Sequence, residues 1–147
     1  MATIGVLTGN TVWNQGIRGG HTITDAAAQC SGQTFNIAGS GEYTVSQVRA
    51  DFKKTSGTDT LRCAIYAVSG SSPTGASLGS ADVSASGVAT TETTMTFTFG
   101  SPPTLTKGTT YVMVFTYAGA GGDGLQQYGS TTSQYAGGHQ IWKSEST

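Results

Sequence analysis

The side chains best suited to chemistry gather in the last quarter of the chain, where aromatic rings alternate with planar polar groups. Trp and Tyr rings stack on the apolar faces of sugars, while Gln, His and Asp side chains exchange hydrogen bonds with sugar hydroxyls. This mixture predicts a carbohydrate-binding site. Its candidate residues are Gln126, Gln127, Tyr128, Tyr135, His139 and Trp142. The alternative is that Tyr128 and Trp142 close one end of a hydrophobic core.

A metal site has one weak candidate in this region, Asp123, which stands in a Gly-Gly-Asp-Gly segment. Calcium takes roughly six to eight oxygen ligands, and a single carboxylate supplies too few of them. The glycines equally suit a turn with positive φ, in which Asp123 bonds to its own backbone. We favour the turn, and therefore expect no metal and no other cofactor.

Groups that could perform catalysis form no recognisable constellation. The two histidines, His21 and His139, are far apart in the sequence, and no GxSxG, HExxH or P-loop motif is present. A nucleophile made from Cys30 and His139 is conceivable, but nothing in the sequence visibly activates a thiol. We therefore expect a protein without enzymatic activity.

The composition limits the classes of partner. The chain has 25 threonines, 16 serines and 22 glycines among 147 residues, and only 10% of its residues are charged, against about 25% in ordinary proteins. With a net charge of −1 and one adjacent pair of cations, Lys53-Lys54, it lacks the basic surface that nucleic-acid binding requires. Its apolar runs are too short to cross a bilayer. We expect neither nucleic-acid binding nor membrane insertion.

The elements that must position these groups are β-strands, because apolar residues alternate with polar ones along most of the chain. In residues 43–54, Val48, Ala50 and Phe52 are expected to point inward, with Arg49, Asp51 and Lys53 outward. Tyr43 and Val45 have the opposite parity, which predicts a bulge near Ser46-Gln47. The other expected strands cover residues 33–38, 60–68, 94–99, 110–117, 125–128 and 139–143.

The connections between these strands complete the expected fold. We expect Ser69–Gly75 to form a loop and Ala81–Val83 a short strand, while residues 110–117 carry apolar side chains on both faces, as a central strand does. About eight to ten strands separated by turns indicate an all-β, two-sheet antiparallel β-sandwich. Cys63 is expected to be a small buried thiol, and its spacing from Cys30 leaves a disulfide open.

Residues 1–32 carry few strand signals and are expected to form an extended N-terminal arm, which leaves a β-sandwich domain over residues 33–147. An arm without a core of its own must pack on something. It would lie on the sandwich as an extra strand, dock on another subunit, or exchange between the subunits of a homotrimer. It also holds a second mixture of aromatic and polar groups around Trp13 and Arg18.

The order of several short segments resembles that of jelly-roll domains, similar to carbohydrate-binding modules, in phage virion proteins and in secreted bacterial enzymes. The segments are Gln33-Thr34-Phe35, Leu61–Tyr66, Pro73-Thr74-Gly75, Leu78-Gly79, Phe97–Phe99, Leu105, Gly108, Tyr111–Val114 and Trp142. The resemblance covers residues 33–143 and implies a jelly-roll type of sandwich. It also implies attachment or particle decoration rather than catalysis.

From this resemblance we expect a structural module of a bacteriophage virion: a head decoration, fibre or spike. Its partners would be capsid or tail protein subunits and cell-surface polysaccharide. The first residues, Met1–Thr8, lack the basic and apolar parts of a signal peptide, so we expect synthesis in the host cytoplasm and incorporation into the virion. The alternative is a carbohydrate-binding module of a secreted bacterial glycoside hydrolase, cut from a longer chain.

Overall fold

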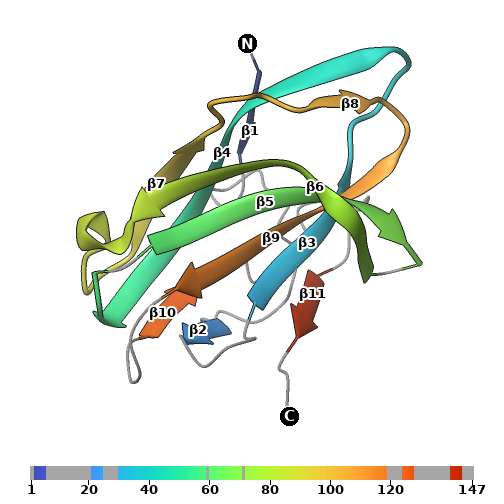
Figure 1. The fold of residues 1–147 in the computed structure, drawn as a ribbon. Coiled ribbons are helices and arrows are strands. Elements are labelled where there is room, and N and C mark those ends of the chain that lie inside the picture. Colours follow the sequence, from blue (N-terminus) through green and yellow to red (C-terminus); the bar gives the residue numbers. More distant parts are fainter. Residues whose placement is uncertain are drawn as a thin grey trace.

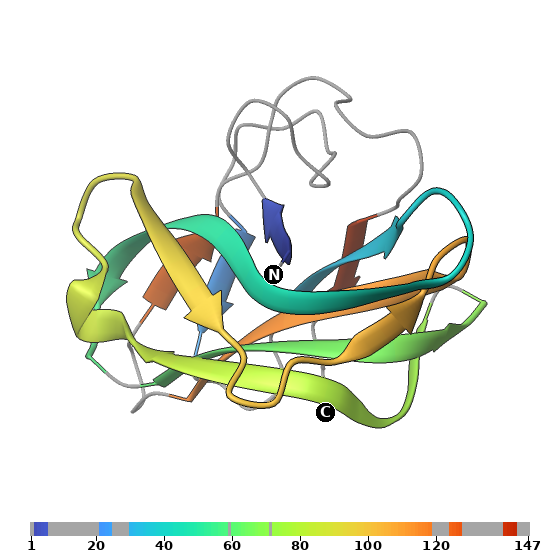
Figure 2. The same ribbon diagram turned by 90° about the horizontal axis from the view of Figure 1, so that it is seen from above.

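The computed structural model describes residues 2–5, 21–24, 30–58, 60–70, 72–118, 124–127 and 140–143. These residues form eleven strands and a short 3-10 helix, η1 (Ala85–Gly87) (Figure 1). Seen from above, the strands lie in two layers, with β4 and β7 in one and β5, β6 and β9 in the other (Figure 2). The expected all-β, two-sheet sandwich is confirmed. No helix of the described part is long and apolar enough to cross a membrane.

The first sheet is organised around the longest strand, β4 (Glu42–Ser56). Its antiparallel neighbours are β7 (Thr93–Thr98), β8 (Thr104–Thr106) and β10 (Gly124–Gln127). A parallel neighbour, β1 (Ala2–Gly5), also pairs with β4, and β2 (His21–Thr24) extends the sheet by pairing with β10. Strands from both ends of the sequence therefore meet on β4.

The second sheet has five antiparallel strands. Their order is β11 (Gln140–Lys143), β3 (Cys30–Asn36), β9 (Thr110–Ala118), β5 (Thr60–Ser69) and β6 (Ser72–Ser84). As predicted, β9 is the central strand of its sheet. Its inner side chains lie in the core, and Val112 and Val114 on its outer face are buried as well.

The described parts of residues 1–32 are strands of this sandwich. Both β1 and β2 hydrogen-bond within the first sheet, and β3 begins at Cys30, so the expected boundary after residue 32 falls inside a strand. The rest of the expected arm, with Trp13 and Arg18, lies outside the described residues.

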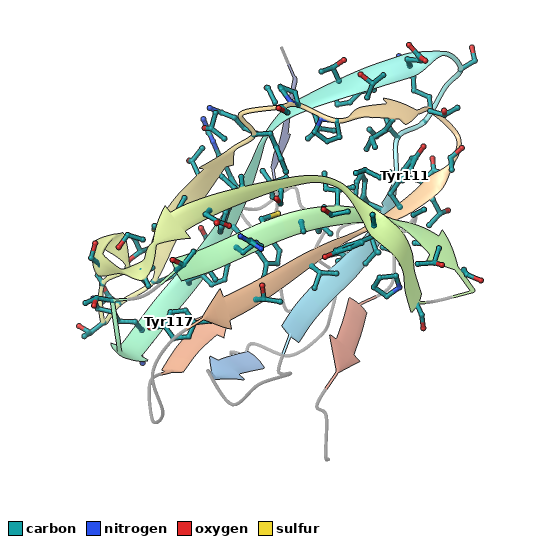
Figure 3. The ribbon with its side chains drawn as sticks, in the orientation of Figure 1. Tyr111 and Tyr117 are labelled. Carbon is teal, nitrogen blue, oxygen red and sulfur yellow. The ribbon has the colours of Figure 1, made fainter. Side chains whose placement is uncertain are left out.

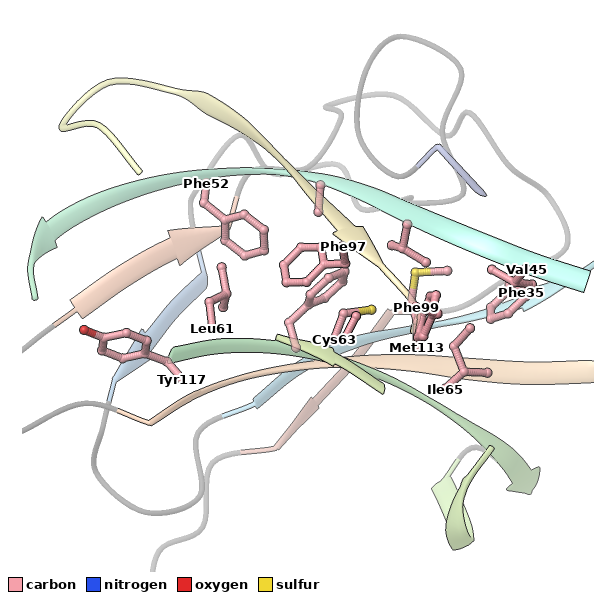
Figure 4. Close-up of a cluster of buried hydrophobic side chains, with 14 of the residues drawn as sticks. Phe35, Val45, Phe52, Leu61, Cys63, Ile65, Phe97, Phe99, Met113 and Tyr117 are labelled. Carbon is pink, nitrogen blue, oxygen red and sulfur yellow. The ribbon is translucent and has the colours of Figure 1, made fainter. Parts of the chain in front are cut away.

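The core between the sheets is centred on three phenylalanine rings (Figure 4). Phe115 of the second sheet lies 5.5 Å from both Phe52 and Phe97 of the first, and those two rings are 6.0 Å apart. The tilted and edge-on geometries each add about 0.5–1.5 kcal/mol beyond the burial of area. Leu61 and Ile65 complete this layer from β5, as their alternation predicts.

The predicted bulge in β4 is confirmed. Val45 and Val48 are both fully buried although they are three residues apart, which requires one extra residue between them. The register of β1 against β4 shifts at the same point. Here the carbonyl of Ser46 accepts a hydrogen bond of 2.9 Å from the Phe99 amide, where β4 changes its partner from β8 to β7.

The prediction of a loop over Ser69–Gly75 is wrong. Ser69 and Ser72 pair across a two-residue hairpin turn, and β6 then runs from Ser72 to Ser84. Gly70 permits the tight turn because it adopts a φ of +63°. The residues of the first half of β6, including the apolar Leu78, are exposed on both faces, so no alternation marks them as a strand. The short strand expected at Ala81–Val83 is only the end of β6.

The edge strand β6 is interrupted near its middle. Thr74 pairs with Ala67 and Gly79 pairs with Ile65, so four residues of β6 face the single residue Tyr66. Beyond this bulge, a Cβ built on Gly79 would lie 2.8 Å from Cδ of Pro103, in the segment between β7 and β8. The two sheets thus approach closely at this edge of the sandwich.

The entry to β9 is fixed by a tyrosine. The backbone amide of Thr106 donates a hydrogen bond of 2.9 Å to the hydroxyl of Tyr111, across a turn in which Gly108 has a φ of +80°. This is the tyrosine corner found in other β-sandwiches. Tyr111 and Tyr117 lie at opposite ends of the same strand (Figure 3), and both rings are buried.

Candidate functional site

The expected glycan-binding residues are divided between the two sheets. Gln126 and Gln127 belong to β10 of the first sheet, opposite Lys53 and Phe52 of β4. Trp142 belongs to β11 of the second sheet. The other expected residues, Tyr128, Tyr135 and His139, and the weak metal candidate Asp123, lie outside the described residues. The positions that can be placed therefore occupy separate sheets.

A polar site does exist on the outer face of the second sheet. Arg62 alternates with the buried residues Leu61 and Cys63, so its side chain points away from the core. Asp82 lies directly opposite it on β6. The guanidinium donates two parallel hydrogen bonds to the carboxylate, from Nε to Oδ1 (2.7 Å) and from Nη2 to Oδ2 (2.8 Å). This bidentate geometry is the most specific that an ion pair can adopt.

The ion pair forms part of an open depression of about 250 Å³ that is lined by Thr60, Arg62, Asp82 and Thr116. Thr116 of β9 lies opposite Arg62 on the other edge of β5, so three neighbouring strands contribute one row of side chains. Thr60 is the preceding outward position of β5. All four side chains carry hydrogen-bonding groups.

Both members of the pair are held in their charged forms. The hydrogen bonds from Arg62 lower the pKa of the Asp82 carboxyl, partial burial opposes this, and the charge of Arg62 adds to the lowering. Asp82 in turn raises the pKa of the Arg62 guanidinium, to which the Tyr66 phenol adds a smaller contribution. The side chains of Arg62 and Asp82 remain 54% and 44% exposed. The described residues of the depression therefore carry no net charge, yet they present strong donors and acceptors to solvent.

The same face continues along β5 toward an aromatic ring. Arg62, Ala64 and Tyr66 occupy alternate positions, and Ala64 and Val114 are buried between the polar depression and Tyr66. Tyr66 itself is partly exposed. A polar depression, a small apolar area and an aromatic side chain thus follow one another along one strand.

This site was missed from the sequence because its two central residues are twenty positions apart. They meet only through the register of the β5–β6 hairpin, whereas the sequence predicts a loop for the first half of β6. One signal was available: Arg62 and Asp82 are each flanked by apolar residues in alternating patterns, which gives both an outward direction.

A second carboxyl group, on the outer face of the first sheet, has a different environment. Asp51 points outward as expected, but only 2% of it is exposed. Thr94 donates a hydrogen bond to Oδ1. Burial raises the pKa of Asp51, and the nearby carboxylate of Glu92 adds to this against the lowering effect of Thr94. No group of three or more residues able to bind a metal exists in the described ranges.

Two other buried groups have no visible chemical role. Cys63 is a free thiol in the core, as expected, so it forms no disulfide, and its burial raises its pKa. Such a thiol is a poor nucleophile. The amide of Gln33 is fully buried, and neither its Nε2 nor its Oε1 has a hydrogen-bond partner among the residues that the structure describes. An unpaired amide of this kind costs stability.

Comparison of the chain with known protein families, with curated proteins and with solved structures finds no match. Its function must therefore be inferred from the fold and from the depression around Arg62 and Asp82.

Proposed function

We propose that the protein is a non-enzymatic structural module of a bacteriophage virion, a head decoration, fibre or spike, which attaches to surface glycans or to neighbouring capsid or tail subunits. The observation that carries the proposal is the strongly hydrogen-bonding depression on the outer face of the second sheet, where Arg62 and Asp82 are exposed and their charges cancel. The virion context comes from the resemblance of the order of short sequence segments to jelly-roll domains of phage proteins.

The surface of the first sheet supports an attachment role. Its strands β7 and β8 present rows of exposed threonines, which are Thr94, Thr96, Thr98, Thr104 and Thr106. Their hydroxyls both donate and accept hydrogen bonds and carry no charge. Such rows suit contacts with polysaccharide or with another protein surface.

The depression is better suited to binding than to catalysis. A catalytic acid needs a pKa near the working pH, whereas Arg62 holds the pKa of Asp82 below its ordinary value. The pair is therefore a fixed recognition element at neutral pH.

A glycan array probed with the labelled full-length chain tests the proposal. We expect binding to neutral polysaccharides without release of sugar, and co-sedimentation with virions or capsids of the parent phage. Hydrolysis of any arrayed glycan, or the absence of both kinds of binding, would contradict it. The alternative, a carbohydrate-binding module of a secreted bacterial glycoside hydrolase, predicts glycan binding without association with particles.

A further inference from the structure

We infer that the outer face of the five-stranded sheet binds a neutral sugar through two adjacent hydroxyl groups, held by Arg62 and Asp82 and flanked by Thr60 and Thr116. The inference rests on the proposed attachment function and names the site and ligand class within it. It differs from the site expected near the C-terminus, because none of these four residues belongs to that set.

The hydrogen-bonding capacity of the ion pair fits a diol. A guanidinium has five N–H donors, and Asp82 uses one on Nε and one on Nη2, so three remain. Each carboxylate oxygen accepts one bond from Arg62 and has a second lone pair. Donors and acceptors therefore lie side by side at the rim of the pair. A hydroxyl also donates and accepts, so two adjacent hydroxyls can meet both partners at once.

The charge balance selects a neutral ligand. Among the described residues that line the site, the charges of Arg62 and Asp82 cancel each other, and the other polar groups are the hydroxyls of Thr60 and Thr116. A phosphate or sulfate would approach the carboxylate as closely as the guanidinium, and an ammonium group would meet the reverse conflict. A sugar hydroxyl avoids both.

Beyond the pair, the next exposed position of this row is the partly exposed Tyr66, because Ala64 between them is buried. Ala64 and Tyr66 continue the outward row of β5, and alternate residues on a strand are spaced about 7 Å apart. The Tyr66 position is thus about 13 Å from Arg62 along the strand, room for a short oligosaccharide. The ring of Tyr66 would contact the apolar face of a second or third sugar unit.

The test uses binding residues that the fold does not need. Exposed ion pairs contribute little to stability, so the variants Arg62→Gln and Asp82→Asn should fold normally. Thr60→Val and Thr116→Val remove one hydroxyl each and keep the branched shape that suits a strand. The matched controls are Thr44→Val and Thr109→Val, which remove exposed hydroxyls outside both this site and the threonine rows of β7 and β8.

The ligands are trisaccharides of mannose, galactose and glucose, with a sulfated trisaccharide as the charged comparison, titrated into ¹⁵N-labelled full-length protein. We expect the Arg62 Nε–H signal to shift with a neutral trisaccharide. Affinity should fall at least 10-fold in Arg62→Gln and Asp82→Asn, about 2- to 10-fold in the two threonine variants of the site, and not at all in the controls.

The outcomes separate this inference from the proposed function. If a neutral glycan binds wild type and the two ion-pair variants equally well, the site is elsewhere and the attachment function stands. If no neutral glycan binds wild type, both fail. Tighter binding of the sulfated sugar, lost with Arg62, would overturn the choice of a neutral ligand.

Discussion

Asp51 and Asp82 lie on the outer faces of opposite sheets, and their environments differ in every respect that controls charge. Asp51 is buried, receives a hydrogen bond from the neutral hydroxyl of Thr94, and lies close to Glu92. Asp82 is exposed and doubly bonded to Arg62. The pKa is raised in the first and lowered in the second. Burial and the charge of the partner, rather than residue type, decide the direction in which the pKa of each carboxyl shifts.

Among the variants that test this difference between the two aspartates, we expect Thr94→Val to change stability most. The substitution Thr94→Val leaves a buried carboxylate oxygen without its donor, and should lower the free energy of unfolding by about 2 kcal/mol at pH 7. Urea denaturation monitored by tryptophan fluorescence measures this. Thr96→Val, one outward position along β7, is the matched control and should be nearly silent. Equal losses in the two variants would mean that the hydrogen bond from Thr94 to Asp51 contributes nothing to the free energy of unfolding beyond the loss of an exposed hydroxyl.

Removing the charge of Asp51 should have the opposite sign. In Asp51→Asn the new side chain keeps an oxygen for Thr94 and can donate its amide to Glu92, so the variant should be more stable by about 1 kcal/mol at pH 7. Because the folded-state pKa is raised, the contribution of Asp51 is fully present below its unfolded value of about 3.9 and is lost as the pH rises through the folded value. The advantage of Asp51→Asn should therefore shrink as the pH falls toward 4.

Denaturation at pH 4, 5.5 and 7 provides the measurement for Asp51→Asn. Glu92→Gln removes the neighbouring carboxylate and should give a smaller stabilisation with the same dependence on pH. A constant difference between Asp51→Asn and wild type at all three pH values would show that Asp51 ionises normally.

At the other sheet, Arg62→Gln should cost less than about 1 kcal/mol, since its pair with Asp82 is exposed. The loss should diminish further in 1 M NaCl, where the screening length is about 3 Å. Thermal unfolding at low and high salt checks both points. A salt-independent loss above about 2 kcal/mol, well beyond the range of exposed pairs, would remove the distinction between the exposed and the buried aspartate.

The smallest effect is expected for Asp82→Asn, again below about 1 kcal/mol at pH 7. The folded-state pKa of Asp82 is lowered, so its contribution is present above about pH 4 and is lost as the pH falls through the folded value. This trend is the reverse of that for Asp51. Parallel pH profiles for the two asparagine variants would contradict the contrast between the sheets.

Sequence patterns predicted the elements whose large side chains alternate. The bulge in β4 follows from the change of parity between Val45 and Val48, and the central place of β9 from its apolar residues on both faces. The first half of β6 could not be found in this way, because its small residues are exposed on both faces. An alternating pattern arises only where one face of a strand is buried, and neither face of this part of β6 is buried.

The polar site depended on information that no local pattern contains. Arg62 and Asp82 become partners through the turn at Gly70 and the offset created where four residues of β6 lie opposite Tyr66. The expected C-terminal site joined Gln126 to Trp142 by nearness in sequence, whereas β10 and β11 belong to different sheets. Sequence proximity is a weak guide in a sandwich whose chain crosses repeatedly between its layers.

The interruption of β6 opposite Tyr66 affects whether another chain can pair with this edge of the sheet. A long, regular edge strand is a template on which another chain can add its own strand, and natural proteins avoid this with bulges and prolines. In β6 the ladder is broken after Thr74, where Gly75 has a φ of +72°, and Pro73 cannot donate a backbone hydrogen bond. Copies placed side by side would meet a discontinuous edge, which disfavours pairing of their β6 strands into a shared sheet.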